Sequence, residues 1–369
     1  MTRRPRSKKQ RGRSRVGERF TVEVGPIAHG GHCVARVPDG DALRVVFVRH
    51  ALPGETVELV LTEGADGDRF WRGDATSVLT PSPDRVTPPC PYSGPDACGG
   101  CDFQHVAVPA QRELKAAVVR EQFARLAKLD LDVVVEPVPG DEDGLRWRTR
   151  QRFVSLPEGR VGMRKHRSHE VVPVEECLIQ AREPASHEVL GRAFSVAPDG
   201  FWQVHPGAAE VLVETVLDFL DPRPGEAVLD LYAGVGLFAA FLADRVGPGA
   251  RVVAVEGEHA ACRHARRNLG SGAEVAAGPV DQVLASAYDE PFDLVVLDPP
   301  REGAKRKVVE QVVDRAPRAV AYVACDPAAL ARDVAIFAEH GYSVQRLRAL
   351  DLFPMTSHVE CVAHLVKSR

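Results

Sequence analysis

The second half of the chain alternates short apolar runs with helix-like segments, and this alternation constrains the fold more than any other feature. The run AVLDLYAGVGLFAAFLA (227–243) is typical of a buried strand, a glycine turn and a helix, and RVVAVEG (251–257) is typical of the next strand. Strands separated by helices form a parallel sheet that is covered on both faces. We therefore predict an α/β, doubly wound domain over residues 201–369.

The same segments contain the residues of a nucleotide-type binding site. Glycines in the turn let the backbone approach a ligand, which then faces the helix N-terminus. Glu256 lies 22 residues after Gly234, near the spacing at which an acid binds ribose hydroxyls. Ala239 stands where a dinucleotide pattern has its third glycine, so the glycines alone do not select the cofactor.

Cys325 ends the apolar run of YVACDP (322–327), where a thiol at a strand end would face a binding site. A buried cysteine is more often a small apolar filler than a nucleophile, and we interpret Cys33, Cys262 and Cys361 in that way. DLFPMTSHVE (351–360), however, places a carboxylate and a histidine near the chain end. Together with the nucleotide-type pattern, Cys325 indicates covalent chemistry on a bound substrate.

Residues 16–79 are predicted to form a small β-barrel behind a basic tail. Short β-branched runs at 20–24, 33–37, 43–48 and 56–61 are separated by glycine, proline and aspartate, as in five-stranded OB-like barrels. Nine arginines and lysines lie within the first 19 residues, and we predict a disordered tail over 1–15. That tail is either a solubilising extension or an arm that contacts nucleic-acid phosphates.

Four of the eight cysteines indicate a metal centre in a central α+β domain over residues 80–200. Cys90, Cys98 and Cys101 lie in a proline- and glycine-rich segment, and Cys177 follows far downstream. A cytosolic compartment keeps thiols reduced, so clustered cysteines favour metal binding over disulfides. Their spacing fits either a 4Fe-4S cluster or a tetrahedral zinc, and unliganded loop cysteines are the remaining alternative.

Alternate arginines in RWRTRQRFV (146–154) predict a strand with one basic face. These are Arg146, Arg148, Arg150 and Arg152. A second basic segment, Arg164, Lys165, His166 and Arg167, follows a short LPEGR turn, so we expect a hairpin that follows a phosphate backbone. The alternative is a solvated sheet edge.

Composition excludes a membrane protein. The chain has 369 residues, is 44% hydrophobic and has a net charge of −4. It has neither the apolar length of a membrane span nor the apolar segment of a secretory signal. We expect a soluble, cytoplasmic monomer.

Five motifs occur in one order and spacing: FWQVH (201–205), DLYAGVGLF (230–238), LDPPREG (297–303), YVACDP (322–327) and FPMTSHVECV (353–362). Jointly they resemble the RNA uracil-5-methyltransferase family, in which S-adenosylmethionine donates the methyl group. IAHGGHCVARV (27–37) and VRHALPGETVEL (48–59) resemble the TRAM domain, an RNA-binding barrel. The resemblance implies a Rossmann-like class I methyltransferase domain and a ribosomal or transfer RNA substrate.

The resemblance also implies a role for each matching residue. Cys325 would be the nucleophile and Glu360 the base. The cofactor would be bound by Gln203, Tyr232, Glu256, Asp281 and Asp298. Cys90, Cys98, Cys101 and Cys177 would hold a 4Fe-4S cluster, as in the cluster-bearing branch of the family.

These roles fit the chemistry of uracil, whose carbon 5 is too weak a nucleophile to take a methyl group unaided. A thiolate that adds at carbon 6 makes carbon 5 nucleophilic, and a carboxylate then removes the carbon 5 proton. The target base must leave its stack to reach such a pocket.

Two residues depart from the family pattern, because Asp326 and His205 stand where the family usually has asparagine. Both changes alter hydrogen bonding, so we expect them to affect base choice. Two other functions remain open: an RNA N-methyltransferase that uses Asp298-Pro-Pro, and a non-enzymatic RNA-binding iron–sulfur protein.

Overall fold

The protein forms two compact units between which the chain passes several times. The computed structural model describes residues 12–139, 141 and 143–368. Unit 1 comprises Met1–Leu114, Arg152–Cys177 and Met355–Ser357, and unit 2 comprises Lys115–Gln151, Leu178–Pro354 and His358–Arg369. The segment 80–200, which we assigned to a central domain, is therefore divided between the two units.

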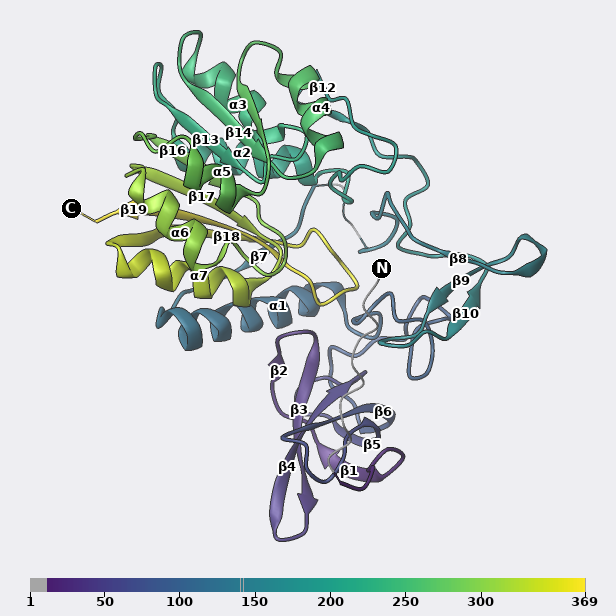
Figure 1. The fold of residues 1–369 in the computed structure, drawn as a ribbon. Coiled ribbons are helices and arrows are strands. Elements are labelled where there is room, and N and C mark those ends of the chain that lie inside the picture. Colours follow the sequence, from purple (N-terminus) through teal and green to yellow (C-terminus); the bar gives the residue numbers. More distant parts are fainter. Residues whose placement is uncertain (1–11, 140, 142, 369) are drawn as a thin grey trace. The chain divides into compact units, whose positions relative to one another are not determined.

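A six-stranded sheet occupies the N-terminal part of unit 1 (Figure 1). Its strands are β1 (Arg19–Glu23), β2 (Ile27–Ala28), β3 (His32–Asp39), β4 (Ala42–Arg49), β5 (Thr56–Glu63) and β6 (Trp71–Thr80), paired in the order β1-β5-β6-β4-β3-β2. Cys33, Ala35 and Val37 of β3 are buried while intervening residues are less so, which is the period-two pattern of a strand with one face on a core. Each of the four runs predicted as strands overlaps one of these elements.

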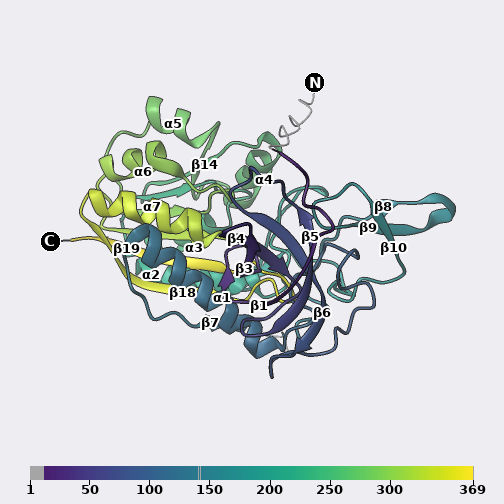
Figure 2. The same ribbon diagram turned by 90° about the horizontal axis from the view of Figure 1, so that it is seen from below.

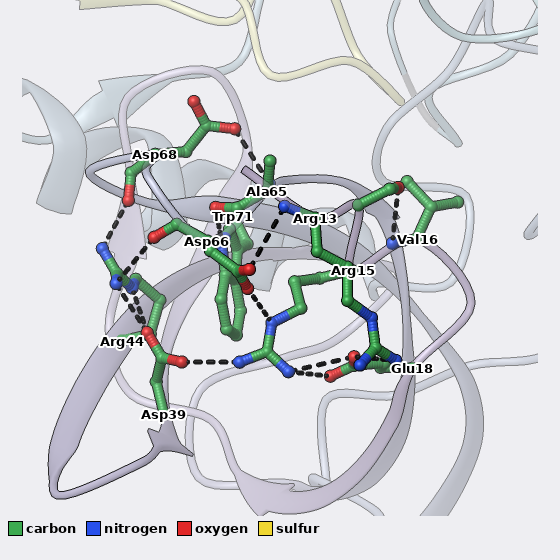
Figure 3. A network of polar contacts seen from close by, with 11 residues as sticks. Arg13, Arg15, Val16, Glu18, Asp39, Arg44, Ala65, Asp66, Asp68 and Trp71 are labelled. Carbon is green, nitrogen blue, oxygen red and sulfur yellow. Dashed lines mark hydrogen bonds and ion pairs between the residues drawn. The ribbon is translucent and has the colours of Figure 1, made fainter. Parts of the chain in front are cut away.

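The last residues of the predicted tail are ordered, so the expectation of disorder is wrong for them. Arg15 forms ion pairs with Asp39 (2.7 Å) and Asp66 (2.6 Å), and its guanidinium lies 5.2 Å from the centre of the Trp71 ring (Figure 3). Arg44 pairs with the same Asp39 and lies 5.4 Å from the same ring. Charge pairing and cation–π contacts thus fix this arginine to the barrel. The other basic residues at 1–11 lie outside the described residues.

The remainder of unit 1 contains the cysteine loop and a small three-stranded sheet. The strands are β8 (Val154–Ser155), β9 (Val161–Arg164) and β10 (Val171–Val174), with a 3-10 turn, η2 (Pro157–Gly159), between the first two. β8 and β9 are antiparallel, which confirms the hairpin across LPEGR.

The basic strand predicted over 146–154 is wrong before Val154. Arg146 has a positive φ of 58°, and Arg148 forms only an isolated parallel bridge with Gln180. The amide of Thr149 donates to the Val204 carbonyl (2.8 Å). Backbone pairing with residues 178–204 therefore replaces the regular strand, and the alternate arginines do not share one strand face.

Unit 2 is built on an eight-stranded sheet (Figure 2). Its strands are β7 (Val135–Glu136), β13 (Val228–Leu231), β14 (Val252–Glu256), β15 (Glu274–Ala277), β16 (Leu294–Leu297), β17 (Ala319–Ala324), β18 (Tyr342–Leu350) and β19 (Glu360–Lys367). The order is β15-β14-β13-β16-β17-β19-β18-β7, and β19 runs antiparallel to both neighbours. The predicted doubly wound sheet is confirmed, with an antiparallel strand inserted near one edge.

Helices cover both faces of this sheet. Residues of α2 (Ala208–Leu220), α3 (Leu237–Val246) and α4 (His259–Leu269) belong to one buried cluster. The second cluster contains residues of α1 (Val108–Gln122), the π-helical turn η1 (Phe123–Ala127), α5 (Val280–Ser286), α6 (Lys305–Asp314) and α7 (Pro327–Glu339). A two-stranded ribbon, β11 (Glu188–Val189) and β12 (Arg192–Ala193), precedes α2. No helix in the described part of the chain has the length and apolarity to cross a membrane.

Candidate active site

The register of two paired strands places Cys325 and Glu360 opposite each other. β17 and β19 are antiparallel, with Ala324 opposite Cys361. Cys325 follows Ala324 and Glu360 precedes Cys361, so these two residues occupy the position that continues the ladder. Opposed residues of an antiparallel pair project from the same face, with Cα atoms about 4.5–5.5 Å apart. The thiol and the carboxyl therefore come from neighbouring strands to one side of the sheet.

Burial disfavours the ionised form of both groups. It raises the pKa of the Cys325 thiol to about 12, and the nearby Glu360 adds to the shift. Burial, followed by repulsion from Asp298, raises the pKa of Glu360 well above its ordinary value, and only 4% of Glu360 is exposed. At rest, burial therefore disfavours both the thiolate and the carboxylate.

Arg301 is the cation that opposes these shifts. Its guanidinium lowers the pKa of both Cys325 and Glu360. The side chain is exposed, and its Nη2 lies 3.3 Å from Nε2 of His358. It follows Asp298-Pro-Pro directly, so the loop after β16 supplies both the cation and an acid. Arg301 therefore favours the thiolate and the carboxylate, which are the reactive forms.

The loop between β13 and α3 has the backbone of a ligand-binding turn. Tyr232, Gly234 and Gly236 all have positive φ, between 56° and 86°. The amide of Gly234 donates to Oε2 of Glu256 (2.8 Å), and the amide of Glu258 donates to Oε1 (2.6 Å). Glu256 ends β14 as predicted, and its carboxylate joins this glycine turn to the start of α4. Left-handed backbone here lets amides face a ligand above the strand ends.

Three carboxyls gather at the ends of adjacent parallel strands. Asp230 of β13, Glu256 of β14 and Asp298 after β16 act on one another electrostatically. Burial, then repulsion from Glu256, raises the pKa of Asp298 to about 7. Burial likewise raises the pKa of Asp230 to about 7, although its Oδ2 accepts from the amide of Ala239 (2.9 Å). This end of the sheet is suited to a cationic or hydroxyl-bearing ligand.

The structure brings three of the five predicted cofactor residues together. Tyr232, Glu256 and Asp298 follow or end β13, β14 and β16. Asp281 lies in the first turn of α5, where Lys307 binds its carboxylate (2.8 Å) and lowers its pKa. Gln203 lies half-buried in the loop before α2. No hydrogen bond within the described segments joins Gln203 or Asp281 to the other three.

Asp326 and His205, the two departures from the family pattern, have local structural roles. Oδ1 of Asp326 accepts from the amide of Ala329 (2.8 Å) and so caps α7, which an asparagine would also do. His205 is buried and stacks on Trp147 at 6.1 Å, and its Nδ1 accepts from the amide of Gly207 (3.1 Å). Burial lowers the pKa of His205 to about 4, so this imidazole is neutral at physiological pH.

All four predicted cluster cysteines lie in unit 1 and are half-buried. Burial raises the pKa of Cys101 to about 12, and Cys177, Cys98 and Cys90 each add to it, so the four thiols lie near one another. The Cys98 sulfur accepts from the amide of Gly100, and the Cys101 sulfur from Gln104, each at 3.4 Å. Such N–H···S bonds accompany metal-bound thiolates.

The loop fits tightly against β9 and the turn that follows it. The amide of Gly99 donates to the Arg164 carbonyl (2.9 Å), and a Cβ atom at Gly99 would lie 2.5 Å from the backbone nitrogen of His166. Only glycine allows this approach. In the described part of the chain, no three histidine, cysteine, aspartate or glutamate side chains are arranged to hold one metal ion.

Comparison with known proteins identifies the family of this chain. Family models match the TRAM domain at residues 13–73, the methyltransferase small domain at 207–322 and tRNA (uracil-5-)-methyltransferase at 282–368. An RNA methyltransferase of Streptomyces avermitilis is 43% identical, covering 95% of this chain and 98% of its own. The 23S rRNA (uracil(1939)-C(5))-methyltransferase RlmD of Chromohalobacter salexigens is 30% identical, covering 94% and 89%. The chain belongs to the RNA uracil-5-methyltransferase family.

A solved structure shares the fold of this family member along nearly its whole length. The tRNA (uracil-54, C5)-methyltransferase of Pyrococcus abyssi, in complex with S-adenosyl-L-homocysteine, superposes with a TM-score of 0.66 at 22% identity. The match covers 93% of this chain and 99% of that one. A class I methyltransferase fold with an N-terminal TRAM domain is therefore confirmed.

Sequence reasoning missed two residues of this methyltransferase site. Asp230 is a carboxyl within an otherwise apolar strand, and such a buried acid requires a partner or a function. Arg301 directly follows the motif that drew attention to Asp298, but its action on Cys325 and Glu360 depends on the fold. The buried position of Asp230 could have been predicted from the sequence, whereas the action of Arg301 on Cys325 and Glu360 could not.

Proposed function

We propose that this protein transfers a methyl group from S-adenosylmethionine to carbon 5 of a uridine in RNA, with Cys325 as the nucleophile and Glu360 as the base. The observation that carries the proposal is the opposed placement of these residues at the paired ends of β17 and β19. Carbon 6 and carbon 5 are adjacent in the uracil ring. A thiol and a carboxyl from neighbouring strands therefore reach the two atoms that must react.

Each step of the reaction has a residue to perform it. The Cys325 thiolate adds to carbon 6 and pushes the electron pair of the 5,6 double bond towards carbon 5. Carbon 5 then takes the methyl group from the sulfonium sulfur, which leaves as the neutral thioether. The Glu360 carboxylate removes the carbon 5 proton, and the returning electron pair expels the Cys325 thiolate. Arg301 favours the ionised form of both groups.

S-adenosylmethionine fits the strand ends beside this pair. It supplies an electrophilic methyl group on a sulfonium cation. Glu256 would accept from the ribose hydroxyls, as an acid at the end of the second strand does in nucleotide sites. Tyr232 and Asp298 would line the same edge, and Gln203 and Asp281 would complete the site. The three clustered carboxyls favour a cationic ligand.

We further propose that Cys90, Cys98, Cys101 and Cys177 hold a 4Fe-4S cluster. Two N–H···S bonds and the mutual electrostatic action of the four thiols support it. In a cubane each cysteine binds a different iron, whereas a zinc site requires all four sulfurs within about 2.3 Å of one ion. The four cysteines belong to unit 1 and Cys325 and Glu360 belong to unit 2, so we infer that the cluster has a structural role and that the methyl transfer needs no electron from it.

We propose 23S ribosomal RNA as the substrate, since RlmD of Chromohalobacter salexigens matches most of the chain. Mass-spectrometric mapping should find one 5-methyluridine in 23S rRNA that disappears when the gene is deleted. Wild-type protein should restore it, and Cys325→Ala should not. A lost modification on a ring nitrogen or an exocyclic amine, or restoration by Cys325→Ala, would contradict the proposal. Loss from transfer RNA instead would change the substrate but not the reaction.

A further inference from the structure

Unit 1 contains a polar cavity that the proposed chemistry does not use. Its volume is about 290 Å³. One wall is formed by β3, β4, β5 and β6 of the barrel, and the other by the cysteine loop and the turn between β9 and β10. This volume is at the lower end of small-ligand pockets and suits one nucleotide, not a duplex.

Three ion pairs neutralise most of the acids that line the cavity, and one of them joins the two walls. Lys165 binds Asp96 (2.7 Å) and Glu170 (2.8 Å), and Arg167 binds Glu63 (3.1 Å). Lys165 also forms a backbone bridge with Cys98. Pairing between the loop, the turn and the barrel therefore holds the cavity, and each of these acids already has a cationic partner.

Four other groups in the cavity remain without hydrogen bonds among the described residues. Nη2 of Arg49 and Nε2 of both His32 and His166 are buried and form no hydrogen bond, although Nη2 of Arg49 forms a long ion pair with Asp102 (4.0 Å). The Asp74 carboxylate forms no hydrogen bond or ion pair with any described residue, and burial raises its pKa. Unsatisfied buried polar groups are costly unless a ligand or water pairs them.

These groups are arranged as a small recognition site. Arg49 of β4 and Asp74 of β6 are partners in a parallel register, so a guanidinium and a carboxylate lie on strands about 4.8 Å apart. His32 lies edge-on to the Phe47 ring at 6.2 Å and to the His166 ring at 6.1 Å. The cavity thus offers fixed donors beside one acceptor, together with aromatic surfaces.

We propose that this cavity binds one unpaired RNA nucleotide and that guanine is the base it prefers. The proposal deepens the proposed function and depends on its RNA substrate. Unstacked RNA bases are recognised by aromatic stacking and by hydrogen bonds to their edges. Guanine has two adjacent donors for the Asp74 carboxylate and two adjacent acceptors, O6 and N7, for the Arg49 guanidinium. A phosphate fits less well, because Asp74 would repel it.

The test measures RNA binding by the full-length protein in the absence of S-adenosylmethionine. Fluorescence anisotropy is measured with single-stranded hexamers that carry one guanine or one adenine, cytosine or uracil at the same place. The wild type should bind the guanine hexamer about 10-fold or more tightly than the others, because one bidentate base contact discriminates by about 1–3 kcal/mol. Asp74→Asn should abolish this preference. His166→Ala should weaken binding of all four hexamers about 10-fold through lost stacking.

Glu170→Gln is the matched control, because Glu170 lines the same cavity but is paired with Lys165. It should keep the guanine preference. An unchanged preference in Asp74→Asn, or competition by inorganic phosphate as strong as by guanosine 5′-monophosphate, would overturn the proposal. Thermal unfolding of each variant checks that it folds. Methyl transfer is assayed separately, so a protein that methylates RNA without a guanine preference refutes only this inference. A guanine preference without methylation refutes only the proposed function.

Discussion

Cys325 combines a nucleophile's position with an unreactive resting state. Its pKa of about 12 arises from burial and from Glu360, and Arg301 opposes the shift. A thiol that stays protonated until substrate arrives is protected from oxidation and alkylation, because the thiolate is the reactive form. Substrate binding must therefore contribute to ionising it.

The first prediction concerns the pH dependence of this thiol in the free protein. Since its pKa is raised from 9.0 to about 12, the thiolate fraction should grow about tenfold for each pH unit up to pH 10. Iodoacetamide labelling of the Cys325 peptide, followed by mass spectrometry, should show that slope. Arg301→Gln should slow labelling at every pH, and Asp298→Asn should accelerate it. Arg306→Gln, an exposed arginine paired with Glu339, should have no effect. A plateau near pH 9 would contradict the assignment.

The sequence singles out Cys325 and Glu360 as candidate reacting residues but does not predict how they lie relative to each other. Cys325 and Glu360 were found from motifs, whereas their opposed placement follows from the β17–β19 register, which no local pattern specifies. One oxygen of Asp326 caps α7. The effect of Asp326 on base choice stays a prediction. Asp281 was expected in the cofactor site, but its pairing with Lys307 depends on α6 packing beside α5.

At the scale of elements, the barrel depends on a buried ion pair. Glu55, which is fully buried, binds Arg85 at 2.6 and 2.7 Å and accepts from the amides of Leu52 and Ser82. This carboxylate joins the turn before β5 to the segment after β6. Burial raises the pKa of Glu55, but the hydrogen bonds from Arg85 and the two amides lower it by more. The pKa therefore lies below its ordinary value of 4.5.

Glu55→Gln should destabilise the barrel by about 3–5 kcal/mol, because it leaves Arg85 uncompensated. The folded-state pKa is depressed, so the wild-type contribution is present above pH 4.5 and lost as the pH falls through the lower folded value. Hydrogen exchange of β5 and β6 amides in urea measures the change. Glu58→Gln, at an exposed position of β5, should cost less than about 0.5 kcal/mol. Equal protection in both variants would contradict the role of the pair.

The cysteine loop makes a second element-scale prediction. Anaerobically purified protein should contain about four iron and four sulfide per chain, as a 4Fe-4S cluster requires. Cys98→Ser should lose both and lower the protection of β9 amides from hydrogen exchange, because the loop binds β9 through Gly99. Cys262→Ser, a cysteine outside the loop, should retain the iron. Zinc with no sulfide in anaerobic wild-type protein would contradict the cluster.

Local sequence patterns predicted most helices and strands, but they failed where a segment pairs with a backbone segment far away in the sequence. The barrel strands and the parallel strands of unit 2 have β-branched runs that leave few alternatives. The arginines at 146–152 also have the strand period. Instead of pairing in a regular strand, however, the backbone amides of Arg146 and Arg148 donate hydrogen bonds to the carbonyls of Leu178 and Ile179. Periodicity alone does not identify the partner of a segment.

At the scale of the whole molecule, each unit is assembled from segments that are not consecutive in the chain. Residues Met355–Ser357 belong to unit 1, while His358–Arg369 belong to unit 2. Only His358 and Val359 separate Ser357, whose hydroxyl donates to Asp102 (2.9 Å), from Glu360. The Glu360 carboxyl, the proposed base, is therefore connected covalently, through two residues, to the unit that contains the TRAM domain. The cytoplasmic location and the monomeric state stay predictions.

The most direct test is covalent trapping with an RNA substrate in which 5-fluorouridine replaces the target uridine. The fluorine cannot leave as a proton does, so the adduct at carbon 6 persists after methyl transfer. Wild-type protein with S-adenosylmethionine should form a complex that survives denaturation and maps to Cys325 by mass spectrometry. Glu360→Gln should still form it, because the base acts later, whereas Cys325→Ala should not. No adduct with wild-type protein on a substrate that it methylates, or an adduct that persists in Cys325→Ala, would contradict the mechanism.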